Sequence, residues 1–269
     1  MLELLQYTFF QHALIGSLLA SIACGIIGTY IVTRRLVFIS GGITHASFGG
    51  IGIALYSGLP PILCAAIFSL FSALGIQWLS TRRDMREDSA IAVFWTFGMA
   101  IGIIFSFLAS GFTTDLSSFL FGNILTISNT DLCLLGAIAV ILAIIFTLFL
   151  HQIISIAFDK EFAQSQKIPV TFLEYLLMLC IAITIVACLR MVGIVLAISL
   201  LTIPQMTANL FTFKFKNMIW LSIVIGFISC IGGLLLSYWL NVPSGATIIF
   251  FSILIYVGCK IENVMVKTK

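Results

Sequence analysis

A single histidine among glycines is the feature of the sequence with the clearest chemical potential. Residues 34–54 read RRLVFISGGITHASFGGIGIA, and five glycines surround His45. On a helix, four of these residues share one face: Gly41, His45, Gly49 and Gly52. An imidazole on a lipid-embedded helix is costly unless it faces a partner or a water-filled path. The pattern therefore predicts either a polar site that lines a translocation path or a face on which a second helix packs closely.

The composition indicates which elements must position this stretch. The chain has 269 residues, of which 61% are hydrophobic and only 9% are charged, whereas soluble domains carry about 25% charged residues. We therefore expect an all-α polytopic membrane protein with one transmembrane domain, residues 1–269. The basic residues lie in short clusters between apolar runs, which excludes a role in nucleic-acid binding. The seven cysteines occur singly and are interpreted as small buried hydrophobic residues.

The apolar runs predict eight or nine crossings at about 20 residues each. The smaller number would apply if one of two segments did not cross fully. The glycine-rich segment 42–57 is short and could be broken or re-entrant, and segment 192–210 contains Pro204. Glu174 falls within one turn of the end of its span, where a charge near the membrane surface costs little.

The distribution of basic residues predicts the orientation. If Arg34 and Arg35 are cytoplasmic, alternation places 12 of the 13 Lys and Arg residues on that side, and Arg190 is the exception. By the positive-inside rule the N-terminus is then outside and the C-terminus cytoplasmic. Arg190 could line the extracytoplasmic opening. Asp115 and Asn123 lie in an outer segment without basic residues, where solvated loop positions are expected.

No catalytic motif is present, so we do not expect an enzyme. The sequence lacks HExxH, GxSxG and GxxxxGK[ST], and without the last of these it cannot hydrolyse ATP by itself. One alternative to consider for a polytopic membrane protein is an ion-coupled secondary transporter. Such proteins tend to carry paired carboxylates within the membrane, and the apolar runs contain none at mid-span.

Several further stretches, taken together with residues 34–54, resemble one family over nearly the whole chain. They are REDSAIAVFWTFGMAIGIIF (86–105), SSFLFGNILTIS (117–128), FDKEFAQSQKIP (158–169), LRMVGIVLAISLLTIPQMTANL (189–210) and PSGATI (243–248). Their order and spacing resemble the membrane permease subunit of bacterial ABC importers for zinc, manganese or iron. Any one stretch is weak evidence, but the shared order is specific.

The resemblance implies a homodimer in the bacterial plasma (inner) membrane with one central path. Two cytoplasmic ABC ATPase subunits would supply ATP hydrolysis, and an extracytoplasmic metal-binding protein would deliver the ion. The divalent metal is then cargo, and no cofactor is bound permanently. The connector at about 158–169 would dock on the ATPase through four residues: Asp159, Lys160, Glu161 and Phe162.

One position departs from the family pattern. Where the family usually has an aspartate one turn before the histidine, this chain has Gly41. An aspartate and a histidine at i and i+4 could hold a divalent ion together, so His45 remains as the only candidate metal contact. Thr44 is adjacent but turned about 100° away on a helix. The stretch Gly41, Thr44, His45 and Gly49 is therefore a candidate path or packing surface, and in a symmetric dimer two His45 side chains could face each other.

Overall fold

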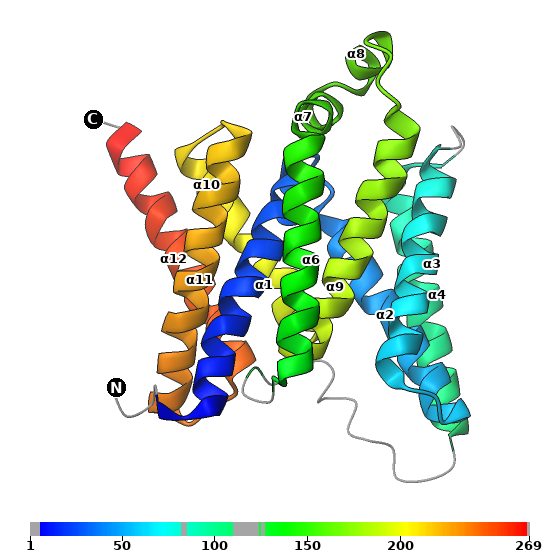
Figure 1. The fold of residues 1–269 in the computed structure, drawn as a ribbon, viewed down its shortest axis with the longest axis vertical. Coiled ribbons are helices and arrows are strands. Elements are labelled where there is room, and N and C mark those ends of the chain that lie inside the picture. Colours follow the sequence, from blue (N-terminus) through cyan, green and yellow to red (C-terminus); the bar gives the residue numbers. More distant parts are fainter. Residues whose placement is uncertain (1–5, 82–84, 110–123, 125–126, 268–269) are drawn as a thin grey trace.

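The computed structural model describes residues 6–81, 85–109, 124 and 127–267, and the regular structure within these ranges is helical. Long helices lie side by side and run from one end of the molecule to the other (Figure 1). Among the described residues, nine stretches are long and apolar enough to cross a bilayer. The prediction of an all-α polytopic protein is therefore confirmed.

The nine stretches share a length of 20 residues or more. They are α1 (Thr8–Thr33), α2 (Val37–Ser57), α3 (Pro61–Thr81), α4 (Glu87–Leu108), α6 (Asn129–Leu148), the first part of α9 (Val170–Leu200), its second part together with α10 (Ile203–Phe211), α11 (Phe215–Leu240) and α12 (Ser244–Lys267). Two short helices, α7 (Leu150–Phe158) and α8 (Lys160–Ser165), separate α6 from α9.

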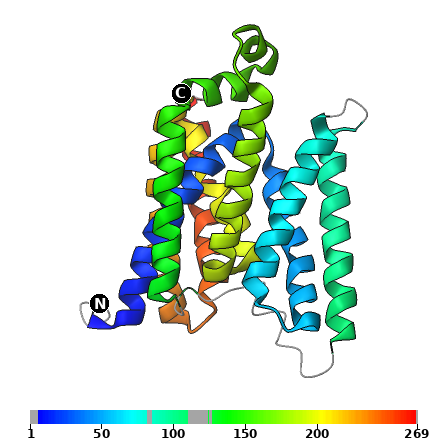
Figure 2. The same ribbon diagram turned by 45° about the vertical axis from the view of Figure 1, so that its right-hand side comes forward.

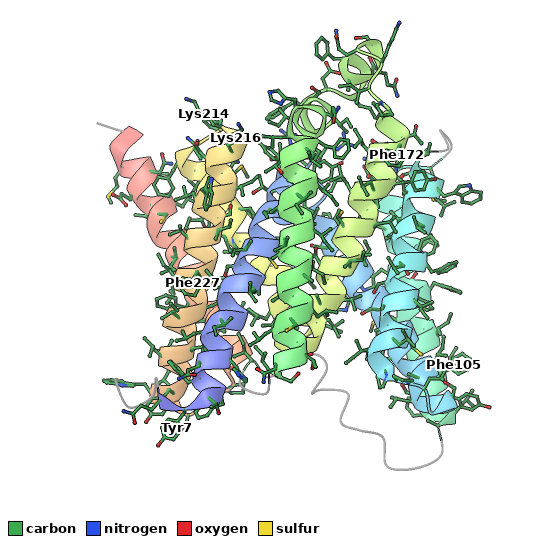
Figure 3. All side chains as sticks on the ribbon, viewed as in Figure 1. Tyr7, Phe105, Phe172, Lys214, Lys216 and Phe227 are labelled. Atoms are coloured by element: carbon green, nitrogen blue, oxygen red, sulfur yellow. The ribbon has the colours of Figure 1, made fainter. Side chains whose placement is uncertain are left out.

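The two ends of the molecule differ in chemistry. The helices α7, α8 and α10 and the C-terminus lie at the upper end of Figure 1, and the N-terminus lies at the lower end. Lys214 and Lys216 are at the upper end, and Tyr7 and Phe105 are at the lower end (Figure 3). Arg34 also belongs to the upper end, because it contacts α7 and α9 there. We call this upper end, which carries Arg34, Lys160, Lys214 and Lys216, the basic end.

Three helices form the interior of the bundle. In α1, α2 and the first part of α9, 72%, 78% and 67% of the span is buried, whereas α4, α6 and α12 are each less than one third buried. The outer helices direct apolar side chains away from the bundle (Figure 3), among them Phe107 and Leu148. Such a surface is stable only against lipid, because no large soluble protein exposes so continuous an apolar surface.

The glycine-rich segment forms one unbroken helix, α2, of 21 residues. The possibility that it is broken or re-entrant is therefore wrong. Its glycines allow close helix approach instead. A Cβ atom on Gly50 would collide with the carbonyl group of Cys64 in α3, and one on Gly52 would collide with the backbone of Gly102 in α4. Small residues thus bring α2 against two neighbours at once, as is common between membrane helices.

A glycine also breaks the longest helix. Gly193, inside α9, has φ 75° and ψ 174°, a backbone conformation that is essentially restricted to glycine. Beyond it the chain returns toward the basic end through α10 (Figure 1). Pro204 stands in the first turn of α10, where a missing N–H breaks no helical bond. Buried Gln205 then fixes α10 to α1 by donating from Nε2 to the carbonyl oxygen of Cys24 at 2.8 Å.

The helix α7 is not anticipated by the sequence patterns. The helix α6 ends at Leu148, the chain turns at Phe149, and α7 then crosses the end of α6 at the top of the molecule (Figure 2). Its buried residues Ile153, Ile156 and Ala157 stand at positions i, i+3 and i+4. This spacing is that of a helix with one apolar face, and the polar residues His151 and Gln152 just before it are the signal that indicates a change of element.

Candidate functional site

His45 lies near the middle of α2 and is half-buried. Its ring stacks on the ring of Trp95 in α4, with centroids 4.7 Å apart and planes 6° from parallel. Its Nδ1 atom is buried and has no hydrogen-bond partner among the described residues. A buried polar atom without a partner is costly. The imidazole therefore has one nitrogen whose hydrogen-bonding capacity is not met within the described residues.

Gly41 shares this environment. A Cβ atom at Gly41 would lie 3.6 Å from the Trp95 ring, an ordinary van der Waals contact. At Gly49 a Cβ atom would lie only 2.9 Å from the Gly98 carbonyl oxygen and from Phe68. The candidate surface thus divides into two parts. Gly41 and His45 lie against Trp95, and a Cβ atom at Gly41 would fit there. Gly49 is a tight packing contact.

The side chain of Thr44 points into the bundle and contacts its own helix. It is fully buried, and its hydroxyl donates to the carbonyl oxygen of Ser40 within α2. The sequence placed Thr44 beside His45 but turned away from it, and the structure agrees. Trp95, by contrast, is missed by the sequence analysis, because nothing in the run around it marks one aromatic ring as the partner of His45.

The described residues contain no group of three His, Cys, Asp or Glu side chains that could hold a metal ion. A protein site that retains a divalent metal usually has three or four ligands. The single imidazole of His45 would therefore supply one ligand and not a complete metal site.

The connector forms a second candidate surface at the basic end. Asp159 caps α8 by accepting a hydrogen bond from the backbone N–H of Phe162 at 2.9 Å. Phe158 and Phe162 expose 66% and 54% of their surfaces, and Glu161 is exposed as well. Lys160 differs from these residues, because its Nζ atom points back to Glu174 of α9 at 2.8 Å. Two exposed aromatic rings beside a charged residue resemble the anchor residues of protein–protein interfaces.

The sequence predicts that the Glu174 charge lies near the membrane surface, where it costs little free energy. This prediction is wrong, since only 4% of the residue is exposed. Other predictions lie outside the described residues. These are the roles of Asp115 and Asn123, most of the 117–128 stretch, and the side chain of Arg190.

The fold and the two surfaces together define a polytopic integral membrane protein with a polar contact at mid-span and a protruding connector. Comparison with known proteins then gives the family. The family model described as "ABC 3 transport family" matches residues 6–262. The chain therefore belongs to the ABC 3 transport family. It is a permease subunit of an ABC transporter complex and not the ATPase, which excludes the secondary transporter.

Individual relatives extend over the same length. An uncharacterized membrane protein of Synechocystis, slr2045, is 40% identical over 256 residues, covering 95% of this chain and 91% of the relative. The manganese transport system membrane protein MntC of Halalkalibacterium halodurans is 37% identical over 247 residues, covering 92% and 85% of the two chains. Among solved structures, PsaBC from Streptococcus pneumoniae in complex with Fab matches with a TM-score of 0.83 and 29% identity, covering 96% of this chain and 93% of the other.

Proposed function

We propose that this chain is the permease of an ATP-driven importer for a divalent metal ion, with manganese as the first candidate. The observation that carries the proposal is the 37% identity to a manganese transport system membrane protein across 92% of the chain. The imidazole of His45 supports it, because one of its nitrogens has no hydrogen-bond partner among the described residues. Imidazole binds first-row divalent metals, and Mn²⁺ also accepts carboxylate, carbonyl and water oxygens.

The translocation path is proposed to lie between two copies of the chain. One imidazole is a weak site, but a twofold axis through the path would place two His45 side chains opposite each other. Gly41 and Trp95 would line the path beside each histidine, since Gly41 stands one helical turn before His45 in α2 and Trp95 contacts both positions. An extracytoplasmic metal-binding protein would deliver the ion to the end opposite the connector.

The basic end is proposed to face the cytoplasm of a bacterial cell, with the N-terminus outside. Arg34, Lys160, Lys214 and Lys216 lie at this end, as the positive-inside rule requires. A reporter cysteine in the 241–245 turn should react with an impermeant reagent in intact cells, whereas one at Lys214 should react only after the membrane is opened. The reverse pattern would contradict the orientation.

Transport in a defined system tests the proposed function directly. The permease is purified with a cognate ABC ATPase and reconstituted in liposomes. Mn²⁺, Zn²⁺ and Fe²⁺ are then supplied one at a time with the binding protein. We expect ATP-dependent accumulation of at least one of these ions, with Mn²⁺ the fastest. Equal accumulation without ATP would contradict the proposal.

The exposed aromatic rings of the connector predict where the ATPase binds. Phe162→Ala should weaken the permease–ATPase complex by about 2 kcal/mol, because exposed aromatic anchors commonly dominate such interfaces. The subunit should remain inserted, since the Phe162 side chain is 54% exposed and α8 keeps the Asp159 cap. The measurement is the dissociation constant of the detergent-solubilised complex.

A matched variant controls for the loss of an exposed phenylalanine. Phe107→Ala removes a ring that is 87% exposed near the end of α4, far from the basic end, and it should bind the ATPase normally. Equal binding by both variants would contradict docking through Phe162. Asp159 is unsuitable for charge reversal, because its replacement also removes the cap of α8.

A further inference from the structure

One buried carboxylate joins the connector to the transmembrane helices. Glu174 begins the second turn of α9 at the basic end, and only 5% of its side chain is exposed. Three donors from different parts of the chain reach it. Lys160 Nζ lies 2.8 Å from Oε2, Gln77 Nε2 lies 3.1 Å from Oε2, and Arg34 Nη2 lies 3.4 Å from Oε1. Both carboxylate oxygens are thus occupied.

These donors come from three separate elements, each of which also packs against α9. Lys160 is the first residue of α8, Gln77 lies in the last turns of α3, and Arg34 follows α1 directly. Arg34 also donates from Nη1 to the carbonyl oxygen of Ile156 in α7 at 3.2 Å. Glu174 therefore connects α8 to α3, to the end of α1 and, through Arg34, to α7. Glu87, at the start of α4, adds a second carboxylate that interacts electrostatically with Arg34 and Lys160.

The remaining attachment of α8 to the bundle is small. Within α8 only Ala163 is buried, and it packs in an apolar cluster with Ile156 of α7 and Val170 and Leu173 of α9. That cluster holds α8 against α7 and α9 alone. The ion pair between Lys160 and Glu174 is the described contact that places α8 on the carboxylate that Gln77 and Arg34 also bind.

An ion pair with one buried partner is an expensive means of stabilising a fold. Desolvation of the buried Glu174 charge offsets part of its attraction to the partly exposed Lys160, and apolar replacements of buried pairs are often as stable. Such pairs are better suited to fixing one particular arrangement of elements. Several donors that converge on one carboxylate move together if that carboxylate moves.

We propose that Glu174 is a positioning residue that transmits movement of α8 to α1 and α3 during transport. The proposal rests on the proposed function, in which α8 docks on the ATPase. When the ATPase displaces α8, the Lys160–Glu174 pair pulls on the start of α9, and Gln77 and Arg34 follow. The end of α3 and the turn between α1 and α2 then shift with the connector. Through that turn the movement reaches the helix that bears His45.

The test compares three replacements in the reconstituted permease–ATPase complex: Lys160→Gln, Lys160→Arg and Glu174→Gln. The measured quantity is metal imported per ATP hydrolysed, alongside the affinity of the permease for the ATPase. The resemblance placed Lys160 among the docking residues, but its Nζ atom pairs with Glu174 of the same chain. We therefore expect Lys160→Gln and Glu174→Gln to bind the ATPase normally but to import about tenfold less metal per ATP, the effect of losing one charge-assisted hydrogen bond. Lys160→Arg keeps the cation and should restore most of the ratio.

Two comparisons separate transmission from folding and from general charge. Lys214→Gln removes an exposed cation at the same end and should leave the ratio unchanged. The double variant Lys160→Gln with Glu174→Gln should be no worse than either single variant, since both remove the same pair. Glu174→Gln changes a buried side chain and could prevent folding. The Lys160 side chain is 40% exposed, so Lys160→Gln should fold and tests the same ion pair.

Several results would overturn the proposal. A wild-type ratio in Lys160→Gln would do so, and so would an equal loss in Lys214→Gln. Loss of ATPase binding in Lys160→Gln would show that the pair only shapes α8 for docking. A wild-type complex that hydrolyses ATP without importing any divalent metal would instead overturn the proposed function, and the coupling role with it.

Discussion

His45→Ala is expected to lower divalent-metal uptake by about 10- to 100-fold, the range seen when groups that support a metal site are removed. The reason is that His45 supplies the one described side chain at mid-span with an unpartnered nitrogen. Assembly should persist, because the ring contact that His45 makes among the described residues is the stack on Trp95, and such a stack contributes about 0.5–1.5 kcal/mol. The measurement is initial uptake in proteoliposomes with equal amounts of inserted complex.

Gly41→Asp provides the opposite change at the same place. The Cβ position at Gly41 has room beside Trp95, so the added side chain should be accepted and the complex should assemble. An aspartate there would stand one helical turn from His45 and form a carboxylate–imidazole pair. We expect a lower half-saturating Mn²⁺ concentration and a slower maximal rate, since oxygen ligands suit this ion.

Normal uptake by His45→Ala at normal assembly would contradict a path-lining role. His45→Gln is the matched control, because it removes the imidazole but keeps a polar side chain able to bond at the same place. If His45→Gln transports normally and His45→Ala does not, His45 acts as a hydrogen-bonding residue and not as a metal ligand.

The second large effect is expected at Gly50. In an ordinary helix, alanine is more stable than glycine by about 1 kcal/mol. At Gly50 the added Cβ would collide with the Cys64 carbonyl group, and backbone cannot move aside without displacing α3. Overpacking of this kind costs about 1–3 kcal/mol. We expect Gly50→Ala to lower the unfolding temperature of the detergent-solubilised permease by about 5 °C and to reduce the yield of folded protein.

Gly41→Ala is the matched control in the same helix. Its Cβ atom would meet Trp95 at an ordinary 3.6 Å, so its thermal stability should equal or exceed that of the natural chain. The two variants differ only in what surrounds the methyl group. Equal stability would mean that α2 and α3 do not approach as closely as the structure indicates.

The class of protein and its crossings are readable from the sequence because hydropathy is a local property. A bilayer requires about 20 apolar residues per helix, and each of the nine stretches satisfies this without reference to its neighbours. The position of the connector is also local, since the charged residues after Phe158 interrupt two apolar runs. The grouping of basic residues at one end follows from the same alternation.

The partners of individual side chains were decided only by the tertiary structure. The position of Glu174 near the end of its helix predicted that its charge would cost little free energy. The carboxylate is instead buried, and its hydrogen-bond donors lie 14, 97 and 140 positions away in the sequence. Trp95 meets His45, and Gly41 has space where Gly50 has none, because α2 packs against α3 and α4 at particular heights. Hydropathy places helices in a membrane but does not say which faces meet. Close packing between neighbouring helices determines those contacts and therefore the site.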